Sequence, residues 1–514
     1  MMQLRRALPL LALLVAGCGS PATPAGPVPP GAVPSPSVAQ VVAIGVNNVP
    51  PTMDSMVVTL TSPRRWDVHD MLVRQAVTGE PEATGLAEQW RAVDATTWEF
   101  KLAPAALFHD ETPVTAEDVV FSLQRAIDPA KRLPITPRVN TIRDAQAVDR
   151  LTVRVLTNGP DPILIRRVAS VPIYPKAYFE RVGESEFGLR PIGAGPFQVK
   201  EFVANDLLVI VPFARHHRLV PRLSEVRIRQ IPDAAPRLAG VRTKELDAVM
   251  QVPIDQATTL RSEGLQLLPY DVGSSGGCRM SGVDETPVKD RRVRLAINYA
   301  VDKEAIARVV FAGLTKPEQG QLVQPGVVGF NPRLQPFPFD QGRARQLLTE
   351  AGWTPGTVVG IEWLRTPQRD QMVLAIQSQL REVGIELDLK PQTDPAQTLG
   401  KLNGSLPREP IGCGTISTTP ALDADFALSW FVGTSTARWL NNPDFDRAYL
   451  ASRTEMDPRR REALLQEALQ VMRDDPPYLF LVPNLDLAAH GKQVQNVVIV
   501  NPFELDLRQS VKTG

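Results

Sequence analysis

Short stretches in which apolar and polar residues alternate recur along the chain, and this period of two is the pattern of a half-buried β-strand. A short apolar run near the beginning of the folded part ends at Asn47-Asn48 and predicts a further strand. The predicted strands are Val41–Val46, Trp98–Leu102, Leu151–Val155, Val226–Ile231 and Ile385–Leu389.

Apolar residues spaced three or four apart lie between these strands and predict amphipathic helices. Polar residues suited to an N-cap precede the stripes, and glycines or prolines follow them. We expect helices that open at Thr115, Asp290, Asp302, Asp340 and Asp457, and one along Met372–Val383; Gly313, Gly352 and Gly384 end three of them. In the helix after Asp302 we expect Ile306, Val309 and Val310 to face inward.

Strands and helices therefore interleave, and the steps from helix through glycine to strand in the second half indicate βα units on a sheet. The sequence predicts a mixed α/β fold without a repeat of fixed period. Because no long linker follows residue 40, we expect a compact body from there on.

The pattern is different in the first 40 residues. Arg5 and Arg6 precede the apolar run Leu8–Val15, which is too short to span a bilayer but suits a secretory signal. Leu14–Cys18 resembles a bacterial lipobox, which implies cleavage after residue 17 and a lipid on Cys18. Residues 18–40 are rich in proline and predict an extended spacer. The alternative is an ordinary signal peptide with an incidental cysteine.

Composition narrows the class of protein. Lys+Arg and Asp+Glu both number 56, so no basic excess points to nucleic acid, and we expect none as a partner. Besides Cys18 the chain has Cys278 and Cys413. In an exported protein two such cysteines commonly pair, the alternative being two buried free thiols.

Several motifs, in order, resemble the extracellular solute-binding proteins of the peptide/nickel family of ABC importers. The motifs are Pro51-Thr52-Met53-Asp54, Leu86–Trp90, Phe108–Val119, Gly193–Phe197, Val293–Asp302 and Asn442–Asp446. Glu111 departs from the glycine that the family has in the turn of the third motif.

The resemblance implies a two-lobed periplasmic-binding-protein-like fold with an additional packing domain. Lobe I is expected to be discontinuous (41–60, 193–277 and 484–514), with the packing domain at 61–192 and lobe II at 278–483. It also implies that Cys278 and Cys413 form a disulfide. A ligand would close the lobes over itself.

The resemblance further implies that a peptide is held through its main chain, between an edge near Val46, Asn47 and Asn48 and another at Thr415, Ile416 and Ser417. Thr415 replaces an aspartate that commonly pairs with the ligand's ammonium group. Asp423 or Asp425 can substitute for it, or both are solvated loop residues. Arg365 and Arg369 lie where a ligand carboxylate can be met, the alternative being an exposed helix start. Trp430 and Trp439 either line the cleft or pack in the core.

Two other sequence features suggest a different chemistry. Gly273–Gly277 fits the pattern G-x-S-x-G around Ser275 and raises an exported serine hydrolase as an alternative, but no helical stripe follows it. His216-His217 has no third ligand nearby in the sequence, so we expect a surface loop and no metal site. His109 is expected to be a structural hydrogen-bonding residue.

The sequence thus predicts a lipid-anchored binding protein on the outer face of the cytoplasmic membrane, not an enzyme and without a cofactor. It would act as a monomer, capture di- or oligopeptides and deliver them to the transmembrane subunits of an ABC permease. The alternative within the family is a non-peptide ligand such as haem, a sugar or chelated nickel.

Overall fold

The predicted strands are present, with ends that differ by at most three residues from the expected ones, in a computed structural model that describes residues 40–58, 66–75, 80–418, 421–501 and 504–513. The signal peptide, Cys18 and the spacer before residue 40 lie outside the described residues. Alternation is realised as burial: in the strand Thr97–Leu102 the side chains of Trp98, Phe100 and Leu102 are buried.

The largest sheet has eight strands in the order β17-β12-β19-β11-β1-β10-β9-β8. With α4 (Ala234–Thr243) and α5 (Ala257–Ser262) it forms what we call the eight-stranded body. In sheet order the strands are Ile416–Ser417, Gln266–Ser275, Pro483–His490, Ala248–Val249, Val41–Val46, Glu225–Gln230, Leu207–Pro212 and Phe197–Val203. The apolar run of β1 is central in this sheet, which explains why it lacks the alternation of the edge strands.

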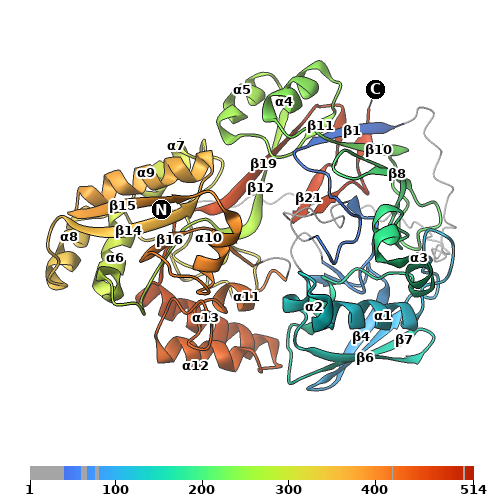
Figure 1. Cartoon of the computed structure of the whole chain (residues 1–514), viewed down its shortest axis with the longest axis horizontal. Coiled ribbons are helices and arrows are strands. Elements are labelled where there is room, and N and C mark those ends of the chain that lie inside the picture. Colours follow the sequence, from blue (N-terminus) through green and yellow to red (C-terminus); the bar gives the residue numbers. More distant parts are fainter. Residues whose placement is uncertain (1–39, 59–65, 76–79, 419–420, 502–503, 514) are drawn as a thin grey trace, which may run out of the picture. The chain divides into compact units, whose positions relative to one another are not determined.

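A second, antiparallel sheet of four strands has the order β4-β5-β7-β6, and α1 lies across one of its faces (Figure 1). We call the sheet and its helices the four-stranded body. Its elements are β4 (Ala87–Asp94), β5 (Thr97–Leu102), β6 (Ile142–Asp149), β7 (Thr152–Thr157), α1 (Ala116–Ile127), α2 (Leu164–Val168) and α3 (Lys176–Leu189). It has a hydrophobic core of its own, around Phe100, Leu123 and Tyr174.

A third sheet, in the order β15-β14-β16-β13-β18, organises residues 278–479 into the five-stranded body. Its strands are Ile385–Gln392, Thr357–Leu364, Ile411–Cys413, Cys278–Met280 and Tyr478–Leu479. The helices are α6 (Arg291–Ala300), α7 (Lys303–Val309), α8 (Gln341–Glu350), α9 (Pro367–Arg381), α10 (Pro395–Leu402), α11 (Ala424–Leu428), α12 (Pro443–Ser452) and α13 (Pro458–Asp474). Strands β14 and β15 are parallel and are joined through α9, which is the predicted βα unit.

Short elements complete the chain. Three two-stranded ribbons pair β2 (Arg74–Gln75) with β3 (Pro81–Glu82), β20 (Val494–Gln495) with β23 (Val511–Lys512), and β21 (Val498–Asn501) with β22 (Glu504–Asp506). Single turns of 3-10 helix lie at Pro129–Lys131, Thr136–Arg138, Ile254–Gln256 and Pro287–Lys289.

The predicted helix caps are confirmed. Thr115 and Asp118 form a capping box at the start of α1, and the carboxylates of Asp290, Asp302, Asp340 and Asp457 each accept a main-chain N–H in the first turn of their helix. Gly313, Gly352 and Gly384 all have positive φ, as expected of residues that end a helix.

One predicted burial is wrong. Val309 is 77% exposed, whereas Ile306 is buried. The helix α7 ends at Val309, and Val310, beyond it, turns inward in its place and is 6% exposed. Val310 follows Ile306 by four residues and continues the buried face, whereas Val309 turns to solvent.

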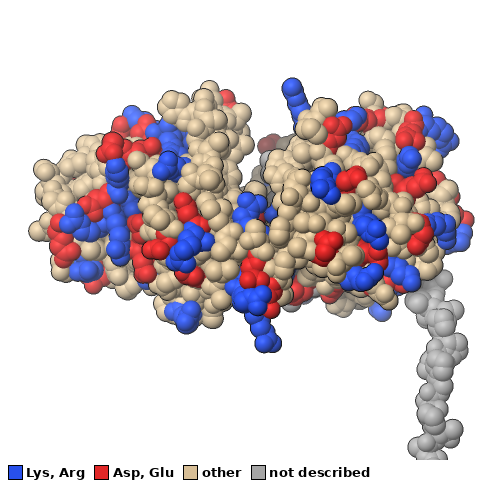
Figure 2. Space-filling model, turned by 90° about the horizontal axis from the view of Figure 1, so that it is seen from below, with Lys and Arg blue, Asp and Glu red and all other residues tan. Residues whose placement is uncertain are grey.

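Charge and hydropathy agree with the composition. On the face that Figure 2 shows, lysine and arginine side chains lie among aspartate and glutamate side chains. None of the helices in the described part of the chain combines the length and the apolar character needed to cross a bilayer.

Candidate ligand-binding site

Three segments pass from the eight-stranded to the five-stranded body. Strand β12 continues through Gly276-Gly277 into β13, β16 continues through Gly414-Thr415 into β17, and β18 leads into β19. A Cβ atom on Gly277 would lie 2.0 Å from the carbonyl oxygen of Leu479, so the crossing strands approach too closely for any side chain there. The glycines around Ser275 are therefore a connection between two bodies.

The crossing is braced by two kinds of contact. Cys278 and Cys413 form a disulfide where β13 and β16 leave the five-stranded sheet, as the resemblance implied. The hydroxyl of Tyr478 accepts the N–H of Gly277 at 2.7 Å and donates toward the carbonyl oxygen of Gly414 at 3.3 Å. One buried side chain thus touches all three crossing segments.

Arg279 lies directly beside this crossing and is only 1% exposed. Its Nη2 donates to the carbonyl oxygen of Thr415 at 3.2 Å, whereas Nε and Nη1 are buried and have no hydrogen-bond partner. Among the described residues no carboxylate pairs with it. Burial lowers the pKa of the Arg279 guanidinium to about 10, so it remains charged at neutral pH.

Two of the predicted ligand contacts lie near this guanidinium. Its carbon atom is 5.1 Å from the ring centre of Trp430, which is half-buried. Arg369 is close enough to lower the pKa of Arg279 further by charge repulsion, and its Nη1 is 3.4 Å from the carbonyl oxygen of Leu364. Arg365, in contrast, is committed to Asp370 at 2.9 Å. The guanidinium groups of Arg279 and Arg369 and the ring of Trp430 thus lie near one another, beside the crossing segments.

Both predicted main-chain segments belong to the eight-stranded sheet, but only the second lies at an edge, because β1 pairs with β10 along its whole length. Val46 ends β1 and is buried, Asn47 is exposed, and Asn48 carries a buried Oδ1 without a hydrogen-bond partner. Ile416 and Ser417 pair with β12 as strand β17, at the opposite edge of the eight-stranded sheet from β8.

Asp423 and Asp425 are neither solvated nor unpaired. Both oxygens of Asp423 accept from Arg461 at 2.7 Å, and Oδ1 also accepts the N–H of Asp425 at 2.9 Å. Asp425 lies 3.4 Å from Arg167 and 3.2 Å from Arg453. The fold explains this difference, because α13 and α2 bring Arg461 and Arg167 to the start of α11, where the local sequence shows only acidic side chains.

Trp439 packs in the core, one of its two expected places, and His109 has the structural role predicted for it. Trp439 is fully buried and donates from Nε1 to the carbonyl oxygen of Leu402. His109 lies between main-chain groups of two family-motif glycines, Gly193 and Gly195.

Ser275 is not built as a nucleophile. It lies within β12 rather than on a turn into a helix, is buried, and donates to Glu318 at 2.9 Å. His490, the one histidine downstream, pairs with Gln266 at the other end of the same strand. A base within reach of the hydroxyl is what a serine nucleophile needs, so this geometry does not support a hydrolase.

The adjacent histidines are not on an exposed loop. The side chain of His216 is 3% exposed and, with His217, lies beside the buried carboxylate of Asp70. The third group was missed because it is far away in the sequence and is brought there by the fold.

Sequence reasoning also missed Arg279. A signal was available: an arginine directly follows a cysteine in a strand whose neighbours are apolar, where a charge is costly to bury. Only the tertiary structure shows that no carboxylate of the described residues pairs with this charge.

Comparisons with known proteins agree with this architecture. A family model for bacterial extracellular solute-binding proteins, family 5 (middle part), matches residues 83–438. The glutathione-binding protein GsiB of Pectobacterium atrosepticum is 26% identical over 423 residues, which are 79% of this chain and 81% of that protein.

Solved structures show the same fold. DppA from Helicobacter pylori in complex with the peptide STSA has a TM-score of 0.73 at 21% identity, over 92% of this chain and 98% of that one. NikA from Brucella suis in complex with Fe(III)-EDTA has a TM-score of 0.81 at 20% identity, over 92% and 100%. The predicted two-lobed α/β class is confirmed, and the chain belongs to the bacterial extracellular solute-binding proteins of family 5.

Proposed function

We propose that this chain is the lipid-anchored, substrate-binding component of an ABC importer and that it captures a peptide or peptide-like ligand through a carboxylate at Arg279. The five-stranded body would move relative to the eight-stranded body about the three crossing segments. The expected lobes I (41–60, 193–277, 484–514) and II (278–483) are the moving parts of this proposal. The permease would receive the closed, loaded form.

The observation that carries the proposal is the charge of Arg279, which no carboxylate in the described part of the chain pairs with. Burying a guanidinium without a counter-ion is costly, and two of its nitrogens also lack hydrogen-bond partners. A bound carboxylate would supply both the charge and two acceptors, since guanidinium and carboxylate match as a fork. Binding of a carboxylate would therefore remove the free-energy cost of the unpaired guanidinium in the empty protein, and this gain would add to the affinity.

Neighbouring residues support an acidic ligand rather than an uncharged one. Arg369 adds a second cation and Trp430 an aromatic face, whereas Thr415 offers no charge for an ammonium group. Asp423 is committed to Arg461, so we assign it a structural role. Asn48, Thr415, Ile416 and Ser417 remain the proposed main-chain and side-chain contacts of the ligand, next to Val46 and Asn47.

The relatives fit this class of ligand. Glutathione, named for GsiB, carries carboxylates, as do the peptide in DppA and the chelator in NikA. A carboxylate-bearing metal chelate is thus the second candidate ligand, favoured by the same pair of arginines. A neutral sugar would leave both guanidinium groups unpaired.

Titration calorimetry on the full chain with glutathione, tripeptides and Fe(III)-EDTA tests the proposal. For the ligand that binds, Arg279→Gln should weaken binding by at least about 30-fold, because a buried charge on the ligand is left without its partner. Blocking the ligand carboxylate as an amide should have a similar effect. Arg365→Gln is the matched control, since Arg365 already pairs with Asp370, and should bind like the parent.

Unchanged affinity in Arg279→Gln would refute the carboxylate site. The importer role fails separately if none of the ligands, nor a wider panel of solutes, binds the parent chain. In that case the family membership shown by the sequence would stand without this function.

The anchor is tested on its own. Cys18→Ser should release the chain from membranes without changing its unfolding curve, because thioether-linked acyl chains hold it there and the folded body begins after residue 40. If the variant stays in the membrane fraction after a salt wash, the lipobox interpretation is wrong.

A further inference from the structure

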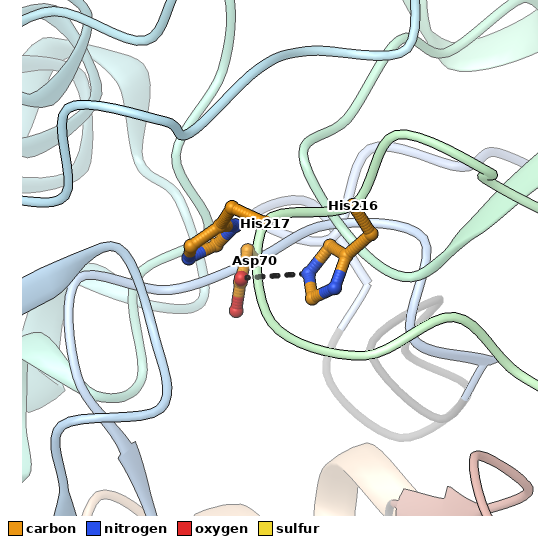
Figure 3. A group of neighbouring side chains, drawn as sticks. All are labelled: Asp70, His216 and His217. Atoms are coloured by element: carbon orange, nitrogen blue, oxygen red, sulfur yellow. Dashed lines mark ion pairs between the residues drawn. The ribbon is translucent and has the colours of Figure 1, made fainter. Parts of the chain in front are cut away.

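Three ionisable side chains converge at a place remote from Arg279 in the sequence. Figure 3 shows the carboxylate of Asp70 between the imidazoles of His216 and His217. One ligand atom from each of the three lies within 4.8 Å of the others. Asp70 precedes β2, whereas the histidines follow β9, so two distant segments build this cluster.

The ring nitrogens that face away from Asp70 contact main-chain groups. Nε2 of His217 is 3.3 Å from the carbonyl oxygen of Gly85, which can only accept, so the Nδ1 of a neutral ring carries the lone pair. Nδ1 of His216 accepts the main-chain N–H groups of Leu219 at 3.1 Å and Arg218 at 3.4 Å, and it lies 3.0 Å from the carbonyl oxygen of Leu219. A metal ion at Nε2 would require the proton of His216 on Nδ1, where the carbonyl oxygen of Leu219 can accept it. A carbonyl on the second nitrogen is the usual support of a metal-binding histidine.

The inward-facing atoms have no partners of their own. Asp70 Oδ2, His216 Nε2 and His217 Nδ1 are all buried and have no hydrogen-bond partner among the described residues. Asp70 Oδ2 and His216 Nε2 are 3.7 Å apart, which is too long for a hydrogen bond. It is close to the separation of about 3.3 Å between two ligands of one tetrahedral zinc ion with bonds near 2.0 Å.

The carboxylates around the cluster are paired with guanidinium groups, except at one oxygen. Arg74 takes the other oxygen of Asp70 at 2.8 Å and pairs with Asp67 at 2.7 Å. Arg508 pairs with Asp506 at 2.8 Å. Burial and the nearby charge of Arg218 both lower the pKa of His217. Among the described residues, Asp70 Oδ2 is the carboxylate oxygen of the cluster that stays without a hydrogen-bond partner.

We propose that Asp70, His216 and His217 bind a divalent transition-metal ion of the zinc class. Two imidazole nitrogens and one carboxylate oxygen suit zinc, nickel or cobalt rather than calcium or magnesium, which prefer oxygen. Three protein ligands leave a fourth position for water. The ion would fasten the segment around Asp70 to the loop after β9, and through Gly85 to the start of the four-stranded body. It is a structural site, separate from the proposed ligand site.

Calorimetry with Zn²⁺ and visible absorption with Co²⁺ test this site on the full chain, freed of metal with a chelator. The chain should carry Cys18→Ser, so that no free thiol competes. We expect one ion per chain, Co²⁺ absorption bands that Zn²⁺ abolishes, and a higher melting temperature with Zn²⁺. His216→Gln and His217→Gln should each weaken Zn²⁺ binding at least 100-fold. His490→Gln is the control, because this histidine lies in β19 and bonds to Gly491, and should bind like the parent.

Either of two results would overturn the site: no binding of Zn²⁺ or Co²⁺ up to 100 µM at pH 7.5, or binding in the two glutamine variants that is as tight as in the parent. If a glutamine variant does not fold, X-ray absorption of the zinc-loaded parent decides. Two imidazoles in the coordination shell support the proposal, and a shell without imidazole refutes it.

Discussion

At the scale of single residues, some charged side chains are buried, which costs free energy. Each of them either has a partner in the fold or, as we propose, binds a ligand. Asp423 is buried, but Arg461 takes both of its oxygens. Arg279 is equally buried, and no carboxylate among the described residues pairs with it. The contrast separates a structural charge from one that is kept for a ligand, because an unpaired buried charge lowers stability unless function requires it.

Glu111 has a strained backbone conformation. It has a φ of 67°, in the left-handed region, at the turn where the family has glycine. A side chain in this conformation costs about 1 kcal/mol. Glu111→Gly should therefore be more stable than Glu111→Ala by about 1 kcal/mol, as measured by urea unfolding. Both variants lose the exposed ion pair with Arg215, so that loss cancels in the comparison. Equal stabilities would show that the turn relaxes around the side chain.

At the scale of elements, caps and stops decide where helices begin and end, and the sequence carries them. The junction of α6 and α7 adds something that local patterns do not show. Lys303, in the first turn of α7, is 3% exposed and donates to the carbonyl oxygens of Asn298 and Val301 at the end of α6. Burial, and then the charge of Arg473, lowers the pKa of Lys303 to about 7.

This junction should make stability depend on pH. Between pH 7 and about 10.5 the unfolded chain keeps the proton of Lys303 and the folded chain does not, so the free energy of unfolding should rise with pH. From pH 7 to 10 the gain is up to about 4 kcal/mol. Lys303→Met should flatten the curve relative to the parent in urea unfolding at pH 7, 8.5 and 10. Lys316→Met is the control, because Lys316 is exposed, and it should leave the pH dependence of the free energy of unfolding unchanged. The same pH dependence in the parent and both variants would contradict the lowered pKa of Lys303.

At the scale of the whole molecule, the described parts of separate bodies meet at a few polar contacts. Arg166 of α2 donates to the carbonyl oxygen of Ala421 at 3.0 Å, and Arg167 lies 3.4 Å from Asp425. These contacts join the four-stranded to the five-stranded body. A cavity of about 560 Å³ lies beside them, lined from both sides by residues that include Ile163 and Phe330. If the bodies move apart when the ligand leaves, these are contacts that must break.

Arg167→Met should therefore lower the apparent affinity for ligand by about 5- to 10-fold, without touching the ligand. The reason is that the closed form would be less populated before binding. Calorimetry measures the affinity, and small-angle scattering of the empty chain should show a larger radius of gyration. Arg181→Met, which removes a cation stacked on Tyr178 in α3, controls for the loss of an arginine from the same body. Equal affinities in all three chains would contradict a role in closure.

By itself the sequence determined the strands, the capped helices, the α/β class and the family, because periodicity, caps and ordered motifs are local features. Only the tertiary structure decided which charges are paired. Arg461 pairs with Asp423, no described carboxylate pairs with Arg279, and Asp70 lies beside His216. These relations join residues far apart in the chain, and the free energy of a buried charge depends on what the fold brings within a few ångströms of it.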